Sequence, residues 1–188
     1  MRRRRFHFKR NDYRMARRGN AIIGGMSLLS ICQWIQNTDS STSLRESTYI
    51  FPIIETTHVL VLSLSVGLLV VSDLRLIGAV MPRRPASEVF RQLAPWMLAG
   101  FAIMFASGLL LFWSQALKAY NSIFFRTKLL LLILAGVNAA VYHLTVYRHM
   151  SEWENKLVPP GQARLAGWLS LIIWAGVIAA GRTMAYTF

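Results

Sequence analysis

A long apolar stretch, residues 48–79, carries three ionisable side chains at Glu55, His58 and Asp73. Ionisable groups inside an apolar span are costly to bury in a membrane, so they usually serve a function. Glu55 and His58 are three residues apart and share one face of a helix, and helical periodicity brings Ser65 and Asp73 within about 100° of that face. We therefore expect a membrane-spanning helix with one polar stripe along its length.

Three further apolar runs follow in a chain of 188 residues that is 54% hydrophobic. Runs of about 20 apolar residues are typical of membrane helices. The predicted spans are 49–72, 94–114, 126–147 and 165–186. The connecting segments are too short to bury a core of their own, which excludes a separate soluble catalytic domain. The sequence predicts an all-α, integral membrane four-helix bundle and no enzymatic activity of its own.

The N-terminal 18 residues contain nine Lys and Arg, out of 21 in the whole chain, and the net charge is +13. Such a charge could indicate binding to nucleic acid. Next to apolar spans, however, a basic segment is more typical of a cytoplasmic tail on anionic lipid. We therefore predict that residues 1–20 form a basic cytoplasmic tail that contacts membrane lipids or an acidic partner surface, and that nucleic acid is not a partner.

Residues 21–36 form a shorter apolar segment directly after this basic run. The segment is either an anchor that makes a fifth crossing or an interfacial helix, and Trp34 suits both alternatives. Residues 37–48 are predicted to be a polar linker in which Ser47 or Thr48 caps the next helix.

The orientation depends on whether residues 21–36 cross the membrane. If they cross, the tail shares one side with residues 73–93 and 148–164, and 16 of the 21 Lys and Arg lie there. If they do not cross, the division is 14 to seven, with the tail on the side where residue 49 begins the first span. Because positive charge stays in the cytoplasm, the first arrangement is favoured and places Asp73 and Arg75 at the cytoplasmic face.

From about Ile31 to Phe188 the chain resembles a bacterial inner-membrane family of unknown function. The resemblance rests on short motifs in a fixed order: residues 43–47 (SLRES), 51–58 (FPIIETTH), 73–78 (DLRLIG), 95–96 (PW), 100–101 (GF), 138–143 (NAAVYH) and 181–186 (GRTMAY). It implies a four-helix protein of the bacterial inner membrane with a short helix before the first span. It implies no activity, because the family has none assigned.

Antiparallel spans bring residues from distant parts of the sequence to the same depth. Glu55 and His58 should lie level with Arg182, with Lys128 nearby, and we predict that Glu55 and Arg182 form an ion pair. The buried polar or ligand-binding candidates are Glu55, His58, Asp73, Arg75, Lys128, Asn138, His143 and Arg182. The plainest interpretation of these residues is a set of ion pairs that hold the bundle together.

The histidines raise the question of a bound cofactor. His58 and His143 could each ligate haem b, as histidines do in membrane cytochromes. Their predicted depths differ by roughly 15 Å at 1.5 Å per residue, so we expect that they do not share one iron. Met184 is the one other candidate for a second ligand. A single copper or zinc ion at His58 with Glu55 is a further alternative, whereas a di-iron site needs two Glu-x-x-His motifs and the chain has one.

Two function classes follow. The first is a subunit or binding module of a larger membrane complex that holds a cofactor, a lipid or a quinone head group, including a haem- or quinone-binding electron-transfer subunit. The second is a small transporter or ion pathway along the polar stripe of Glu55, Ser65, Ser72 and Asp73. A wet cavity that joins both faces would favour transport, whereas a dry and fully paired stripe would favour the first class.

Overall fold

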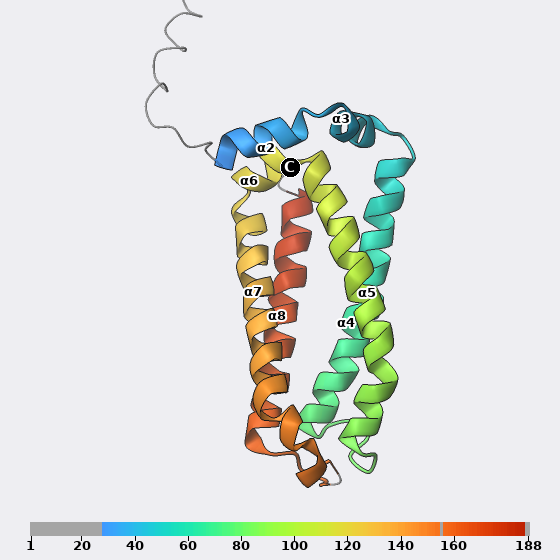
Figure 1. The fold of residues 1–188 in the computed structure, drawn as a ribbon, viewed down its shortest axis with the longest axis vertical. Helices are drawn as coiled ribbons and strands as arrows, with labels where there is room; N and C mark the ends of the chain where they lie inside the picture. Colours follow the sequence, from blue (N-terminus) through green and yellow to red (C-terminus); the bar gives the residue numbers. More distant parts are fainter. Residues whose placement is uncertain (1–27, 155, 187–188) are drawn as a thin grey trace, which may run out of the picture.

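The computed structural model describes residues 28–154 and 156–186, and in this part of the chain four long helices form an antiparallel bundle (Figure 1). The helices are α4 (Ile50–Ile77), α5 (Ala86–Ser114), α7 (Ile123–Thr145) and α8 (Gly161–Tyr186). They contain 23 to 29 residues, and all four are long and apolar enough to cross a membrane. The described residues contain no strand. The prediction of an all-α membrane bundle is confirmed.

Three short helices, α2 (Leu28–Gln36), α3 (Asp39–Glu46) and α6 (Ala116–Asn121), cover one end of the bundle, which we call the cap end (Figure 1). The Gln36 side chain accepts a hydrogen bond of 2.8 Å from the Leu117 amide, and Ser41 Oγ donates to the Trp113 carbonyl at 2.9 Å. The described part of segment 21–36, helix α2, therefore lies across the end of the bundle. The predicted basic tail, residues 1–20, lies outside the described residues.

The predicted polar linker is partly helical, because α3 occupies most of it. Thr38 is the N-cap of α3, and its hydroxyl oxygen accepts a hydrogen bond from the Ser41 amide. This side-chain cap satisfies a backbone donor that has no partner within the helix, so even a short polar segment can become helical. The N-cap of α4 is Tyr49, not the predicted Ser47 or Thr48, and it has no side-chain cap; Ser47 Oγ nevertheless accepts from the Ile50 amide at 3.0 Å.

The opposite end, which we call the loop end, contains residues 78–85, the 3₁₀ helix η1 (Tyr147–Glu152) and the segment that leads to α8. The first span ends at Gly78, whose φ of 90° is the left-handed conformation that glycine adopts readily. The second span begins at Ala86, eight residues before the predicted start, and continues through Pro95. Its polar first turns extend the helix beyond the apolar run, and for this reason hydropathy placed the start too late.

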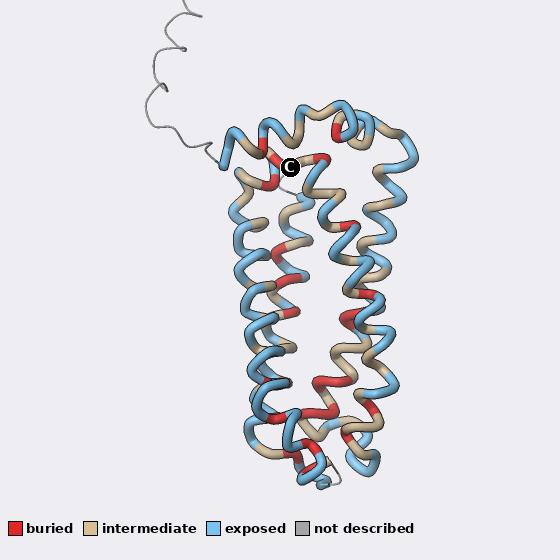
Figure 2. The backbone as a smooth tube through the Cα atoms, in the orientation of Figure 1, coloured by how far each residue is buried: buried red, intermediate tan, exposed pale blue. Residues whose placement is uncertain are grey.

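Side chains from all four spans fill the middle of the bundle. Val66 of α4 and Trp174 and Val177 of α8 are buried there, packed against partly buried residues of α5 and α7. The rings of Phe101 and Trp174 lie 5.4 Å apart. We call this cluster the mid-bundle core. Figure 2 shows buried positions on α4 and α8, while most of α7 is exposed, as expected for a helix that faces lipid.

A second cluster lies at the loop end and joins α4, α5, α7, η1 and α8. Its buried members are Leu76, Ala86, Tyr142, Val146, Met150, Trp153 and Ala163. The Trp153 ring is only 5% exposed, and its indole N–H donates to the Val146 carbonyl.

Candidate functional site

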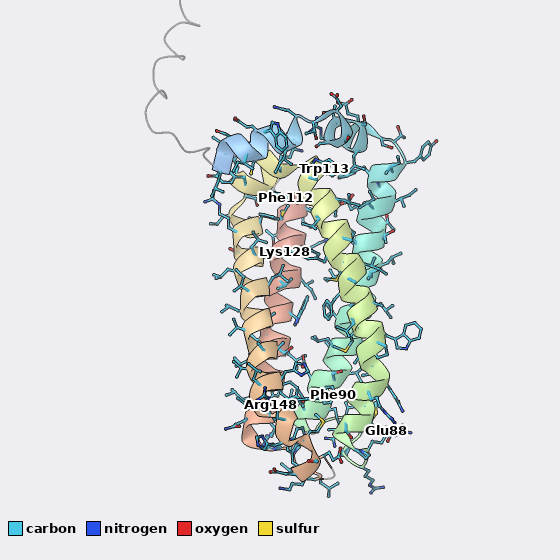
Figure 3. All side chains as sticks on the ribbon, viewed as in Figure 1. Glu88, Phe90, Phe112, Trp113, Lys128 and Arg148 are labelled. Atoms are coloured by element: carbon cyan, nitrogen blue, oxygen red, sulfur yellow. The ribbon has the colours of Figure 1, made fainter. Side chains whose placement is uncertain are left out.

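Polar side chains from three spans meet inside the cap end. His58 of α4, Ser107 of α5 and Lys128 of α7 each lie about 8–12 Å from the cap-end terminus of their own helix, at 1.5 Å per residue. Figure 3 shows Lys128 in this third of the bundle, whereas Phe90 and Arg148 lie at the loop end. We call His58, Ser107 and Lys128 the cap-end site.

The hydrogen bonds of Ser107 define the state of the His58 ring. Ser107 Oγ lies 2.8 Å from His58 Nδ1 and 2.7 Å from the Ile103 carbonyl oxygen of its own helix. A hydroxyl group has one proton, and a carbonyl oxygen can only accept. When Ser107 donates to Ile103, the neutral imidazole must therefore donate from Nδ1 to Ser107. The Met104 carbonyl also accepts a hydrogen bond from the His58 ring. In the tautomer with the proton on Nδ1, Nε2 of His58 is an acceptor.

Lys128 brings a positive charge to the same level. Its side chain is half-buried and interacts electrostatically with His58, and no hydrogen bond or ion pair of its ammonium group occurs among the described residues. Two glycines lie directly against these polar groups. A Cβ at Gly108 would lie 3.3 Å from His58 Cε1, and one at Gly181 would lie 3.6 Å from Lys128 Nζ. The cap-end site therefore presents an acceptor and a cationic donor next to positions without side chains.

Glu55 and Arg182 do not join this site, and the predicted ion pair between them is not formed. Both side chains are exposed. The Arg182 guanidinium donates to the Tyr186 hydroxyl at 2.5 Å and lies 4.7 Å from the centre of that ring. Residues four apart on a helix are neighbours, so Arg182 has a partner within α8 itself. Glu55 lines a shallow surface groove of about 310 Å³ with Pro52, Thr56, Val59 and Leu60 of its own helix.

Arg75 at the loop end is completely buried and joins two loops. Its Nε and Nη2 atoms donate to the Arg84 carbonyl at 3.1 and 2.8 Å, and Nη2 also donates to the Glu154 carbonyl at 3.2 Å. The Ala86 amide donates to the same Glu154 oxygen. Arg75 therefore holds together the two connections at this end, which is a structural role.

Asp73 lies two residues before Arg75 in α4, and its carboxyl group faces α8. Its carboxyl group is hydrogen-bonded by the Ser170 hydroxyl, and the residue is 6% exposed. A Cβ at Gly167 would lie only 2.9 Å from the Asp73 carbonyl oxygen, so the absence of a side chain at Gly167 permits this close approach of α4 and α8.

The remaining candidates have separate positions. Asn138 Nδ2 donates to the Ala166 carbonyl at 3.0 Å and so links α7 to α8. His143 is exposed, and its ring lies 5.4 Å from the ring of Tyr142 and 5.0 Å from that of Tyr147. His58 and His143 thus lie toward opposite ends of the bundle. The described residues contain no group of three or more His, Cys, Asp and Glu side chains placed to hold a metal.

Sequence reasoning missed Ser107, Gly108 and Gly181 at one end and Tyr142 and Ser170 at the other. Serine, glycine and tyrosine are common within apolar helices, so none of these residues is conspicuous by itself. A signal was present in Ser107 and Gly108, because small residues mark the sides along which membrane helices approach one another.

Comparison with known proteins gives one match. The model of a family described as "Family of unknown function (DUF6644)" matches residues 48–187, which include all four spans. No curated protein and no solved structure matches the chain.

Proposed function

The chain belongs to this family of unknown function, and from its structure we propose that it is a membrane-embedded binding module of a larger membrane complex. In this proposal the cap-end site binds the head group of a lipid-soluble quinone, which enters from the bilayer between the spans. His58 and Lys128 contact the head group, and Ser107 orients His58.

The proposal rests on two groups that lie in the same site: Nε2 of His58, which is a hydrogen-bond acceptor, and the Lys128 ammonium group, which is a cationic donor. Nε2 of His58 can accept a proton from a quinol hydroxyl, while the Lys128 ammonium group can donate to a quinone carbonyl. Binding pockets in membranes combine apolar walls with a few polar groups of this kind. An unpaired lysine inside a bundle is costly, and a polar head group there reduces that cost.

The mid-bundle core is the reason to prefer a binding module over an ion pathway. Val66, Trp174 and their apolar neighbours from all four spans lie between the cap-end site and Asp73. A path for ions would need polar groups or water through this level. Glu55 also faces the outside of the bundle. The polar stripe along α4 therefore does not line a continuous path through the inside of the bundle.

Quinone binding can be measured by quenching of tryptophan fluorescence. The purified full-length protein in detergent is titrated with decylubiquinone, and we expect saturable quenching. Lys128→Met should weaken binding by about tenfold, the loss expected when a charged hydrogen-bond donor is removed. Arg182→Gln is the matched control, because Arg182 is a cation near the same end of the bundle that faces outward, and it should leave the affinity unchanged.

Two results would count against quinone binding. Unsaturable quenching, or equal affinities of the wild type and Lys128→Met, would contradict the proposed site. A Soret absorption band in the purified protein would instead support the haem alternative, with Nε2 of His58 as an axial ligand.

We also propose an orientation in the bacterial inner membrane. Helix α2 lies at the cap end, and residues 19–27 are too few to cross a bilayer, so the nine basic residues of the first 18 belong to the cap-end side. This side then has 14 of the 21 Lys and Arg, and the positive-inside rule makes it cytoplasmic. The arrangement reverses the orientation favoured by a fifth crossing.

A further inference from the structure

Three oxygen-bearing side chains from three different spans meet at the loop end. They are Asp73 of α4, Tyr142 of α7 and Ser170 of α8, and we call them the loop-end site. Asp73 is 6% exposed and Tyr142 is 7% exposed. Neither Asp73 Oδ2 nor the Tyr142 hydroxyl has a hydrogen-bond partner among the described residues. Buried polar atoms nearly always have a partner, so these two atoms are places where a water molecule or an ion can bind.

Contacts within the bundle bring the three side chains together. The Ser170 hydroxyl is hydrogen-bonded to the Asp73 carboxyl group, and the Tyr142 hydroxyl is within electrostatic range of the same group. Tyr142 packs in one buried cluster with Leu76, which lies one helical turn after Asp73. Gly167, one turn before Ser170, allows the backbone of α8 to approach Asp73 closely.

The Asp73 carboxylate has no ion-pair partner within residues 28–154 and 156–186. Arg75 is only two positions away and its Nη1 atom has no hydrogen-bond partner, but two residues of a helix point about 200° apart. The Nε and Nη2 atoms of Arg75 donate to loop carbonyls. An isolated carboxylate in an apolar interior costs several kcal/mol. A water molecule would supply hydrogen bonds to the site but would not balance a negative charge, which only a proton or a cation can do.

We propose that the loop-end site binds one monovalent cation of the Na⁺ class. All three side chains offer oxygen atoms, which are the ligands of hard cations, whereas copper and zinc favour nitrogen and sulfur. One carboxylate balances one positive charge, and this favours a monovalent over a divalent ion. The bound cation joins α4, α7 and α8 at a level where these helices have no direct ion pair. The site is independent of the cap-end site and of its ligand.

Thermal unfolding in different salts tests this proposal. The full-length protein in detergent is heated in NaCl, KCl or choline chloride at one ionic strength, and unfolding is followed by tryptophan fluorescence. A ligand that binds only the folded state raises the melting temperature in proportion to the logarithm of its concentration. We expect the melting temperature to rise with NaCl relative to choline chloride and to show a half-saturation concentration.

Two variants locate the effect. Asp73→Asn keeps the shape of the side chain but removes its charge, and its melting temperature should be the same in NaCl and choline chloride. Tyr142→Phe removes one ligand oxygen and should raise the half-saturation concentration about fivefold. Glu55→Gln is the matched control, because Glu55 is an exposed carboxylate of the same helix, and its response to NaCl should equal that of the wild type.

Direct binding of ²²Na⁺ to the wild type and to Tyr142→Phe keeps the test valid if Asp73→Asn fails to fold. Saturable binding that weakens in Tyr142→Phe supports the site. Equal melting of the wild type in NaCl and choline chloride, together with no saturable ²²Na⁺ binding, overturns the proposal and assigns the two unpaired atoms to water.

Discussion

Gly100 shows how closely α4 and α5 pack. A Cβ at Gly100 would overlap the Oγ atom of Ser65, which is fully buried. We predict that Gly100→Ala lowers the free energy of unfolding by about 1–3 kcal/mol, the usual cost of overpacking. In a Ser65→Ala background the cost should be smaller, because the hydroxyl that the new methyl group meets is gone. Unfolding of the four proteins of this double-mutant cycle in detergent measures both values.

Gly136→Ala is the control for this cycle, since a Cβ at Gly136 has no neighbour within 4 Å. It should leave stability unchanged or slightly raised, because alanine has the higher helix propensity. An equal loss of stability in Gly100→Ala and Gly136→Ala would show that α4 and α5 are not in close contact at Ser65.

At the residue scale the sequence predicted which polar groups are unusual, but not which way they point. Asp73 and His58 were selected because ionisable groups are rare in apolar spans, and both do lie within the bundle. Glu55 and Arg182 were selected on the same grounds and are exposed. Depth follows from residue number along a helix, whereas direction depends on how each helix is rotated against its neighbours, and that rotation is determined by packing contacts such as Gly100 with Ser65.

At the scale of elements, Arg75 is the residue on which the loop end most depends. We predict that Arg75→Met lowers the free energy of unfolding by roughly 2–4 kcal/mol, because it removes charged hydrogen bonds and leaves the Arg84 and Glu154 carbonyls unpaired. Arg75→Lys should recover only part of this loss, since an ammonium group cannot bond both carbonyls in the same planar geometry. Unfolding in detergent and protease cleavage within residues 78–85 report the two effects.

Arg83→Met is the control for Arg75, because Arg83 is an exposed arginine of the same loop. Its cleavage rate and stability should match those of the wild type. If Arg75→Met were as stable as Arg83→Met, the carbonyl contacts of Arg75 would contribute nothing measurable to the loop end.

The cap is attached to the bundle by side-chain contacts of α3. Ser41 Oγ donates to the Trp113 carbonyl, and Arg45 donates to the Ser114 carbonyl, so both satisfy acceptors at the C-terminal end of α5. We predict that Ser41→Ala raises amide hydrogen exchange across α3 by about fivefold, the equivalent of one lost hydrogen bond of roughly 1 kcal/mol. Exchange measured by mass spectrometry on peptides of residues 38–48 gives the value.

Ser43→Ala is the matched control, because Ser43 is an exposed serine of the same helix. Its exchange should equal that of the wild type. Faster exchange in both variants would attribute the effect to the local helix propensity of α3 rather than to its contact with α5.

The elements show where periodicity and hydropathy succeed and where they fail. Four apolar runs predicted four spans, because a helix satisfies its backbone hydrogen bonds within one continuous segment in lipid. The same criteria missed α3 and the first eight residues of α5, since both are polar. Their helical state depends on Thr38 as a cap and on the contacts of Ala86 with the loop end, and neither is visible in hydropathy.

At the scale of the whole molecule, the two polar sites lie at opposite ends and the mid-bundle core separates them. We predict that Lys128→Met and Asp73→Asn act independently. Decylubiquinone affinity should be unchanged in Asp73→Asn, and the response of the melting temperature to NaCl should be unchanged in Lys128→Met, because distant sites without shared contacts have additive effects. A change of more than about threefold would show coupling between the sites through the core, whether in the decylubiquinone affinity of Asp73→Asn or in the NaCl half-saturation concentration of Lys128→Met.

The arrangement of charge predicts the orientation of the bundle, and two exposed serines can report it. Ser43 lies in α3 at the cap end, and Ser151 lies in η1 at the loop end. In a Cys32→Ser background, we predict that a membrane-impermeant maleimide labels Ser151→Cys in intact bacterial cells but labels Ser43→Cys only after lysis. The reverse pattern would place the loop end in the cytoplasm. Labelling of both in intact cells would contradict the three crossings by α4, α5 and α7 that separate Ser43 from Ser151.

The basic residues of the N-terminal segment decide this prediction. Without the first 18 residues, the cap-end side has five Lys and Arg and the loop-end side has seven, so the remaining charge favours the opposite orientation. Deletion of residues 2–18 should therefore make part or all of the Ser43→Cys protein reactive in intact cells. Unchanged labelling after the deletion would mean that the N-terminal charges are not required, and that a determinant other than the number of basic residues fixes the orientation.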